Sequence, residues 1–114
     1  MSFVLEKEMI KYTTPAVTLI VENTDITSND IYVSLEQGTT ELTKTGDALA
    51  IEVTEEGTQI GFVLTQEESA LFDPNRNVSI QVNWISSNGV RAATDIRTIP
   101  VMKNLLDEVI EYGD

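Results

Sequence analysis

The 114-residue chain contains no cysteine and no histidine. Without cysteine there is no disulfide framework, no thiolate nucleophile and no thiolate metal site. Without histidine the chain lacks the commonest general base and the commonest transition-metal ligand. We therefore expect a protein that is not an enzyme, with no catalytic residues, no metal and no cofactor.

Basic residues are also scarce: seven Lys and Arg stand against 19 Asp and Glu, which gives a net charge of −12. Binding to nucleic acid or to an anionic membrane needs clustered cations, so neither is an expected partner. The simpler interpretation of the acidity is solubility and repulsion between copies. The alternative is an acidic face that meets a basic partner.

Long apolar runs are missing too. No stretch approaches the roughly 18 apolar residues of a membrane-spanning helix. Glu6 and Glu8 interrupt the start of the chain, which argues against a secretory signal peptide. The expected compartment is a reducing cytoplasm, which the protein would leave only by a route such as cell lysis.

What the chain does have is alternating apolar residues, within a hydrophobic content of 41%. Residues 78–101 hold two alternating runs on either side of Asn88-Gly89, the strongest short-range signal of a β-hairpin. Trp84, the single tryptophan, falls on the apolar face and is expected in the core. The alternation changes phase along the second run, which predicts a β-bulge or a bend near Arg97-Thr98.

Shorter alternating runs between turn residues predict further strands at residues 16–22, 31–36, 41–44, 49–53 and 58–64. About seven strands with short connections predict an all-β fold, an antiparallel immunoglobulin-like β-sandwich. Thr65 to Glu68 fits a capping box and predicts a helix of about two turns that bridges two strands. Asp73-Pro74 would end this helix.

The two ends of the chain carry apolar residues that a small monomer would struggle to cover. We expect a single domain over residues 1–114, divided into an arm (1–14), the sandwich (15–103) and an amphipathic helix (104–112). Two interpretations of this helix stay open: it packs on its own sandwich, or it packs against other copies or a partner. The candidate interface residues are Phe3, Val4, Leu5, Leu105, Leu106, Val109, Ile110 and Tyr112.

The residues with reactive or ligating side chains show no catalytic pattern. Residues 73–77 begin like a calcium loop, but the twelfth position, which needs a bidentate carboxylate, is Trp84. Adjacent carboxylates point away from each other on a strand or helix, so three such pairs are expected to be solvated. These pairs are Glu55-Glu56, Glu67-Glu68 and Asp107-Glu108.

Arg91, Asp95 and Arg97 alternate along one face of the last strand. Charges of opposite sign at this spacing predict an ion-paired surface. The alternative is an exposed face that recognises a partner.

The order of motifs along the chain resembles a known group of proteins. The motifs are LEQGTTELTKTGDAL (35–49), FVLTQEESALF (62–72), a strand with Trp84, VRAATDIRTIPV (90–101) and LLDEVI (105–110). Together they resemble small structural proteins of phages and prophages of Gram-positive bacteria, similar to the N-terminal β-sandwich module of baseplate upper and tail proteins. The resemblance covers about residues 12–111, and LTQEE (64–68) and DEVI (107–110) carry most of it.

The resemblance implies a virion or assembly protein that works by self-association and docking to other phage structural proteins. It implies a homo-oligomer, with a trimer as the first guess, made in the bacterial cytoplasm and then built into the virion. No active-site residue follows from it. The alternative function is a carbohydrate- or cell-surface-binding β-sandwich, for which exposed Tyr32 and Tyr112 are the residues to test.

Overall fold

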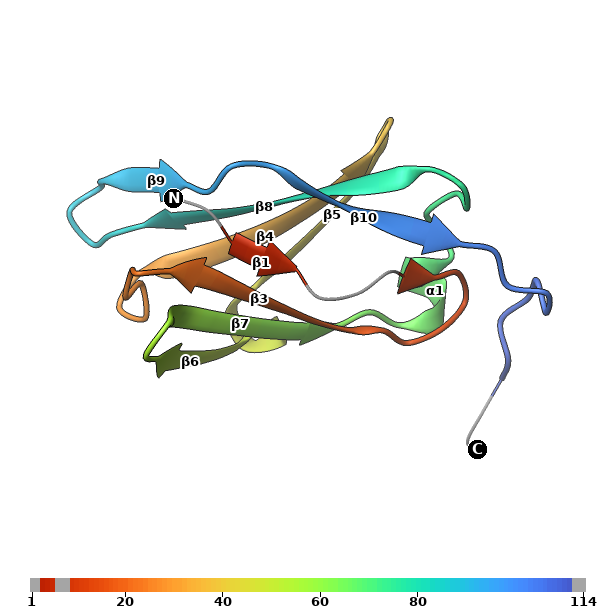
Figure 1. Cartoon of the computed structure of the whole chain (residues 1–114), viewed down its shortest axis with the longest axis horizontal. Helices are drawn as coiled ribbons and strands as arrows, with labels where there is room; N and C mark the ends of the chain where they lie inside the picture. The colour runs from red at the N-terminus through yellow and green to blue at the C-terminus, as the bar shows by residue number, and fades with distance from the viewer. Residues whose placement is uncertain (1–2, 6–8, 112–114) are drawn as a thin grey trace.

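Two β-sheets make up most of the computed structural model, which describes residues 3–5 and 9–111 (Figure 1). The four-stranded sheet has the order β1-β3-β7-β6, formed by β1 (Phe3–Leu5), β3 (Ala16–Glu22), β7 (Gly57–Val63) and β6 (Ala50–Thr54). The second sheet has the order β2-β10-β8-β4-β5, formed by β2 (Met9–Ile10), β10 (Arg97–Met102), β8 (Asn77–Ile85), β4 (Asp30–Gln37) and β5 (Thr40–Thr45). A short strand, β9 (Arg91–Ala93), also pairs with β8. The predicted all-β fold is therefore confirmed.

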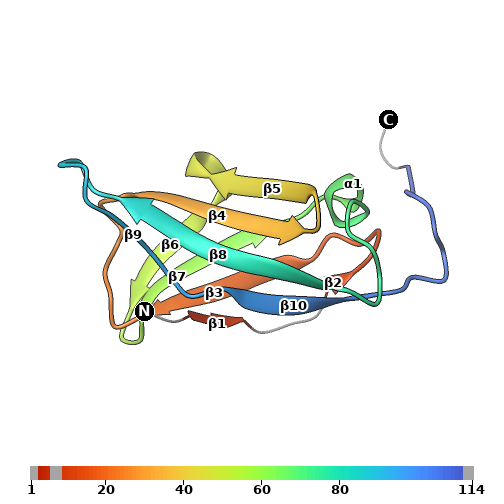
Figure 2. The ribbon, with the colours of Figure 1, turned by 90° about the horizontal axis from the view of Figure 1, so that it is seen from above.

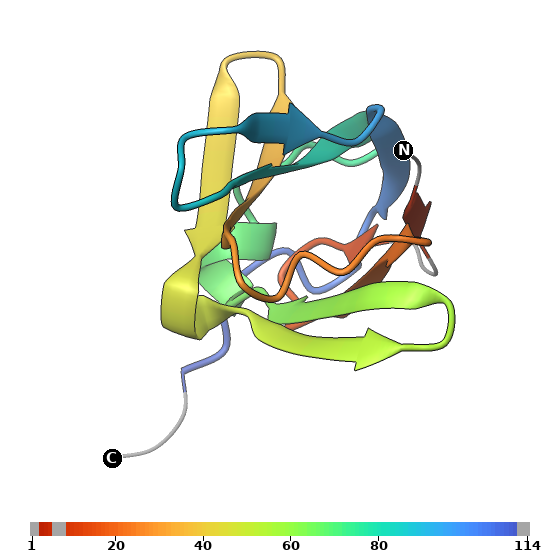
Figure 3. The same ribbon diagram turned by 90° about the vertical axis from the view of Figure 1, so that its left-hand side faces the viewer.

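The two sheets enclose one hydrophobic core (Figure 3). Alternation along β8 places Val78, Ile80 and Val82 fully inside, and Trp84 is only 5% exposed, as predicted. On the opposite sheet Leu19 and Ile60 face each other across β3 and β7, and both are fully buried. Because burying a large aliphatic side chain stabilises the fold by about 1.5–3 kcal/mol, this alternation is the main reason for the architecture.

The N-terminal segment contributes a strand to each sheet (Figure 2). β1 pairs antiparallel with β3, and β2 pairs in parallel with β10 through Met9–Val101 and Ile10–Met102. The described part of the expected arm is thus paired with the chain's own sheets. Strand β1 lies beside β3 in one sheet, and β2 lies beside β10 in the other.

The predicted hairpin is confirmed between β8 and β9. Ser86 N donates to Val90 O at 2.9 Å, and Gly89 has a φ of +86°, which suits glycine. The predicted bulge also occurs, slightly earlier in the chain. Asn83 is opposite Ala93 and Ile80 is opposite Arg97. The four residue steps from Ala93 to Arg97 are therefore matched by only three steps along β8, from Asn83 to Ile80. The extra residue lies within residues 94–96.

The helical content is smaller than predicted. The bridging helix α1 (Gln66–Ser69) has a single turn, although its capping box at Thr65 and Glu68 is present. It joins β7 to β8 and so connects the two sheets at one end (Figure 1). A 3₁₀ turn, η1 (Gly46–Ala48), connects β5 to β6. Among the described residues, no helix is long and apolar enough to cross a membrane.

The prediction of a C-terminal helix over residues 104–112 is wrong for the part that the structure describes, because residues 104–111 contain no helix. Asn104 Oδ1 instead accepts a hydrogen bond from Leu106 N at 3.0 Å. Gln66 pairs with both backbone groups of Ile110. A helix of this length is marginal without tertiary support, so these side-chain bonds to its backbone, one local and two from the distant Gln66, decide the conformation.

Candidate functional site

The predicted interface residues fall into two separate places. Phe3, Val4 and Leu5 form β1, and their backbone is paired with residues 19–21 of β3. The C-terminal set belongs to residues 103–111, here called the tail segment, which extends beyond the α1 end of the sheets (Figures 1 and 2). The structure therefore does not bring the two sets together into one surface. Tyr112 lies outside the described residues.

The tail segment exposes most of its apolar side chains. Leu105 is 93% exposed, Ile110 57% and Leu106 50%, while Val109 is half-buried. These residues were predicted to share one helical face. They lie instead on a bent segment without regular secondary structure, where Leu105, Leu106 and Ile110 are exposed.

Two side chains fasten the tail segment to the body. Asn104 Nδ2 donates to Lys11 O at 3.0 Å, near the start of the segment. Further along, Gln66 Nε2 donates to Ile110 O at 2.9 Å and Gln66 Oε1 accepts from Ile110 N at 2.8 Å. A side-chain amide that both donates to and accepts from one residue imitates a neighbouring strand. The tail segment is therefore anchored at two points, with exposed leucines between them.

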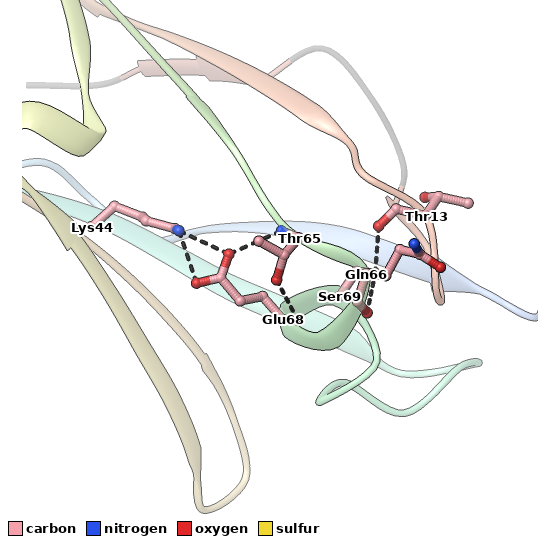
Figure 4. Close-up of polar contacts among 6 residues, drawn as sticks. All are labelled: Thr13, Lys44, Thr65, Gln66, Glu68 and Ser69. Carbon is pink, nitrogen blue, oxygen red and sulfur yellow. Dashed lines mark hydrogen bonds and ion pairs between the residues drawn. The ribbon is translucent and has the colours of Figure 1, made fainter. Parts of the chain in front are cut away.

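Helix α1 is itself held by polar contacts with three parts of the chain (Figure 4). Lys44 Nζ of β5 donates to both carboxylate oxygens of Glu68 at 2.8 Å. Thr65 N donates to Glu68 Oε1 at 2.9 Å, and Ser69 Oγ donates to Thr13 O at 2.7 Å. Burial raises the pKa of Glu68, but the hydrogen bonds from Lys44 and Thr65 outweigh it and hold that pKa below its usual value. These contacts fix Gln66, and with it the tail segment.

A second feature is a hollow of about 400 Å³ on the outer face of the sheet formed by β5, β4, β8 and β9. Tyr32 stands in this hollow with 41% of its surface exposed. Arg91 lies beside it and donates from Nε and Nη2 to Asn83 Oδ1, at 3.3 and 3.0 Å. The lining residues are Tyr32, Ser34, Thr43, Asn83, Trp84, Ile85 and Arg91.

The sequence predicts no hollow here, but two of its lining residues are candidates from the sequence. Tyr32 is expected to be an exposed aromatic, and Arg91 is expected on a charged face of the last strand. Asn83 and Thr43 could not be identified from the sequence, because their position depends on strand pairing that the alternation does not reveal. The structure places Tyr32 opposite Asn83 and Ser34 opposite Thr43.

The charged face of the last strand divides into two parts. Arg97 Nε lies 3.0 Å from Asp95 Oδ2, and both side chains are about half exposed, which agrees with the predicted ion pair. Arg91 is directed instead to the neutral Asn83. Arg91 therefore differs from Asp95 and Arg97, because its partner is a neutral amide and not an opposite charge.

The adjacent carboxylates are mostly solvated, as expected. Glu55, Glu56 and Glu67 are exposed. Glu68 is the exception, because it forms the ion pair with Lys44. In the part of the chain that the structure describes, no three acidic side chains come close enough together to hold a metal ion.

Comparison of the chain with protein-family models and with curated proteins finds no match. The functional interpretation therefore rests on the motif order of the sequence, on the fold, and on two surface features, the tail segment and the Tyr32 hollow.

Proposed function

We propose that this chain is a non-catalytic structural or assembly module of a phage or prophage particle, associated with the tail or baseplate. It acts by self-association and by docking to other phage structural proteins, as a homo-oligomer for which a trimer is the first arrangement to test. It is made in the bacterial cytoplasm and is then built into the virion. The motif order described above and the exposed tail segment support this function.

Within this proposal the fold is an immunoglobulin-like β-sandwich. In chain order β1, β3, β4, β6, β7, β8 and β10 take the places of strands A to G. The sheet order β1-β3-β7-β6 then corresponds to A-B-E-D, and β10-β8-β4 corresponds to G-F-C. Strand β5 occupies the place of C′, beside C. This agreement of both sheets supports the immunoglobulin-like topology.

The observation that carries the proposed function is the exposure of Leu105, Leu106 and Ile110 on one anchored segment. Burying such a side chain is worth about 1.5–3 kcal/mol, so covering three of them would favour association substantially. The anchors at Asn104 and Gln66 limit how far the segment can move and so reduce the entropy lost on binding. We propose that a second copy of the chain covers these side chains.

Solution mass tests this proposal. We expect the full chain to be oligomeric by light scattering and the double variant Leu105→Asp/Ile110→Asp to be monomeric. Val90→Asp is the matched control, because Val90 is 64% exposed on the β8–β9 hairpin, away from the tail segment. A monomeric wild type, or a double variant that keeps its oligomeric mass, contradicts self-association through this segment.

The second candidate function is binding of a saccharide or a cell surface. One observation favours it: Tyr32 is an exposed aromatic side chain set among polar groups in a hollow. Aromatic side chains with one polar end are common in binding sites, where the ring gives contact area and the hydroxyl gives hydrogen bonds. This function does not depend on the tail segment and so can be tested separately.

A further inference from the structure

We propose that the Tyr32 hollow binds a saccharide that carries a carboxylate, such as a uronic acid, with Arg91 as the residue that recognises the acid group. This inference rests on the second candidate function and adds the chemical class of the ligand. It follows from the shape of the hollow, the hydrogen bonds of Arg91 and the distribution of charge among the cations of the chain.

The shape of the hollow follows from the size of the side chains in neighbouring strands. The outward residues Ser34 and Thr43 are opposite each other on β4 and β5, and both are small. Tyr32 on β4 and Arg91 on β9 are larger and also line the hollow. The resulting volume of about 400 Å³ lies within the roughly 300–1,000 Å³ typical of small-molecule sites.

Arg91 is held in a position that leaves one side of its guanidinium unused. Its Nε and Nη2 atoms both donate to Asn83 Oδ1. A guanidinium has five N–H groups, so Nη1 and the second N–H of Nη2 remain available. Those two nitrogens form the fork that binds a carboxylate through two parallel hydrogen bonds. Asn83 therefore orients Arg91 for an acid group.

Arg91 differs from three other cations of the described residues, each of which has a carboxylate partner. Lys44 is paired with Glu68, Arg76 with Asp73 and Arg97 with Asp95, while Lys11 Nζ lies 5.3 Å from the centre of the Tyr12 ring. Within residues 3–5 and 9–111, the hydrogen-bond partner of Arg91 is a neutral amide, and the lining of its hollow contains no Asp or Glu. In a chain with a net charge of −12, this arrangement keeps a cation available for a carboxylate from outside.

The remaining lining groups suit a sugar ring. Tyr32 offers an aromatic face with partial negative charge, against which the C–H groups of a pyranose can lie. Ser34 and Thr43 offer hydroxyl groups that can both donate and accept hydrogen bonds with sugar hydroxyls. Because the overall charge repels anions at long range, affinity for the acid must come from local contacts. Substitution of Arg91 is therefore a decisive test.

The experiment is an NMR titration of the full ¹⁵N-labelled chain with D-glucuronate and, separately, with D-glucose, which differs at the carboxylate. We expect glucuronate to shift the Arg91 Nε–H and Asn83 signals and to bind more tightly than glucose. Arg91→Gln should weaken glucuronate binding by roughly tenfold, as expected for loss of a charged hydrogen-bond pair, and should weaken glucose binding much less. Arg97→Gln is the matched control and should change neither.

The outcomes separate the two levels of the proposal. Equal binding of both sugars that does not respond to Arg91→Gln would overturn the acidic ligand and leave saccharide binding in place. No shift in the hollow with either sugar would overturn both. Tyr32→Leu should weaken the binding of both sugars. The NMR spectra of Tyr32→Leu and Arg91→Gln show directly whether each variant is folded.

Discussion

The carboxylate of Glu68 takes part in two stabilising interactions, the capping box of α1 and the ion pair with Lys44. Its pKa is raised by burial and lowered by the hydrogen bonds from Lys44 and Thr65, with a net lowering. A carboxylate whose pKa is lower in the folded state stabilises the fold fully above its unfolded pKa. That contribution is lost as the pH falls through the folded pKa.

We expect Glu68→Gln to lower the free energy of unfolding by about 1 kcal/mol at neutral pH, because it removes the charged pair with Lys44. Below the usual glutamate pKa of about 4.3, the difference from wild type should shrink. Urea unfolding at a series of pH values measures both effects. Glu67→Gln is the matched control, since Glu67 is adjacent and exposed. A constant difference across the whole pH range would argue against the ion pair as the cause.

Gly57 shows a different kind of residue-level constraint, set by the backbone. Its φ is +143°, and a Cβ there would overlap Val21 O and lie 2.9 Å from Asn23 N. We expect Gly57→Ala to destabilise the fold by about 2–3 kcal/mol through strain. Gly89→Ala, at a φ of +86° with open space around it, should cost only about 1 kcal/mol. Denaturant unfolding of both variants checks the ranking, and equal costs would contradict the steric explanation.

At the scale of elements, the bulge between β9 and β10 depends on one buried side chain. Thr94 N donates to Val82 O at 2.9 Å, and Thr94 Oγ1 accepts from Val82 N at 3.1 Å. The same hydroxyl donates to Asp95 O at 2.8 Å. The side chain thus replaces the backbone carbonyl that the extra residue has displaced from the ladder.

We expect Thr94→Val to cost about 1–3 kcal/mol, because it leaves the amide of Val82 buried without an acceptor while keeping the shape of the side chain. Thr94→Ser retains the hydroxyl and should cost less. Hydrogen exchange at the Val82 amide, measured by NMR together with urea unfolding, tests this explanation. Unchanged protection of that amide in Thr94→Val would refute the role of the hydroxyl.

The strands could be predicted from the sequence because their cause is local. In β8, Val78, Ile80, Val82 and Trp84 alternate with polar residues, and the structure buries all four. The sequence predicts the irregularity near Arg97-Thr98, whereas the structure has it at residues 94–96. The alternation of apolar residues shows that the phase changes, but it does not show at which residue the hydrogen bonds of the ladder are interrupted. Thr94, a polar residue buried at the bulge, carried no apolar signal.

The C-terminal helix was predicted wrongly for a non-local reason. The apolar spacing of Leu105 to Ile110 fits a helix, but nothing in that spacing indicates that Gln66 pairs with the backbone of Ile110. A segment this short forms a helix only when it packs on a neighbour. The Tyr32 hollow escaped complete prediction in the same way, since its lining comes from two pairs of strands, β4–β5 and β8–β9, that are far apart in the sequence.

At the scale of the whole molecule, charge opposes the proposed self-association. Each copy carries a net charge of −12, so copies repel one another. Salt shortens the screening length from about 30 Å at 0.01 M to about 3 Å at 1 M. If apolar contacts of the tail segment hold copies together, the mass measured by light scattering should rise with salt. A mass that falls with salt would indicate association through ion pairs instead.

The parallel pair of β2 and β10 has a mechanical consequence. The hairpin end and the α1 end lie at opposite ends of the long axis, and the strands run along it (Figure 1). A pull through Phe3 and Lys103 would therefore load the bonds of β1 with β3 and those of β2 with β10, including Lys11 N to Met102 O at 3.1 Å, in shear. Bonds loaded in shear must break together, whereas a hairpin opened from its end loses them one at a time. Single-molecule stretching of the full chain should record one high-force event, and stepwise peeling at low force would contradict this. Under such a load the chain would hold its shape through these two short N-terminal strands.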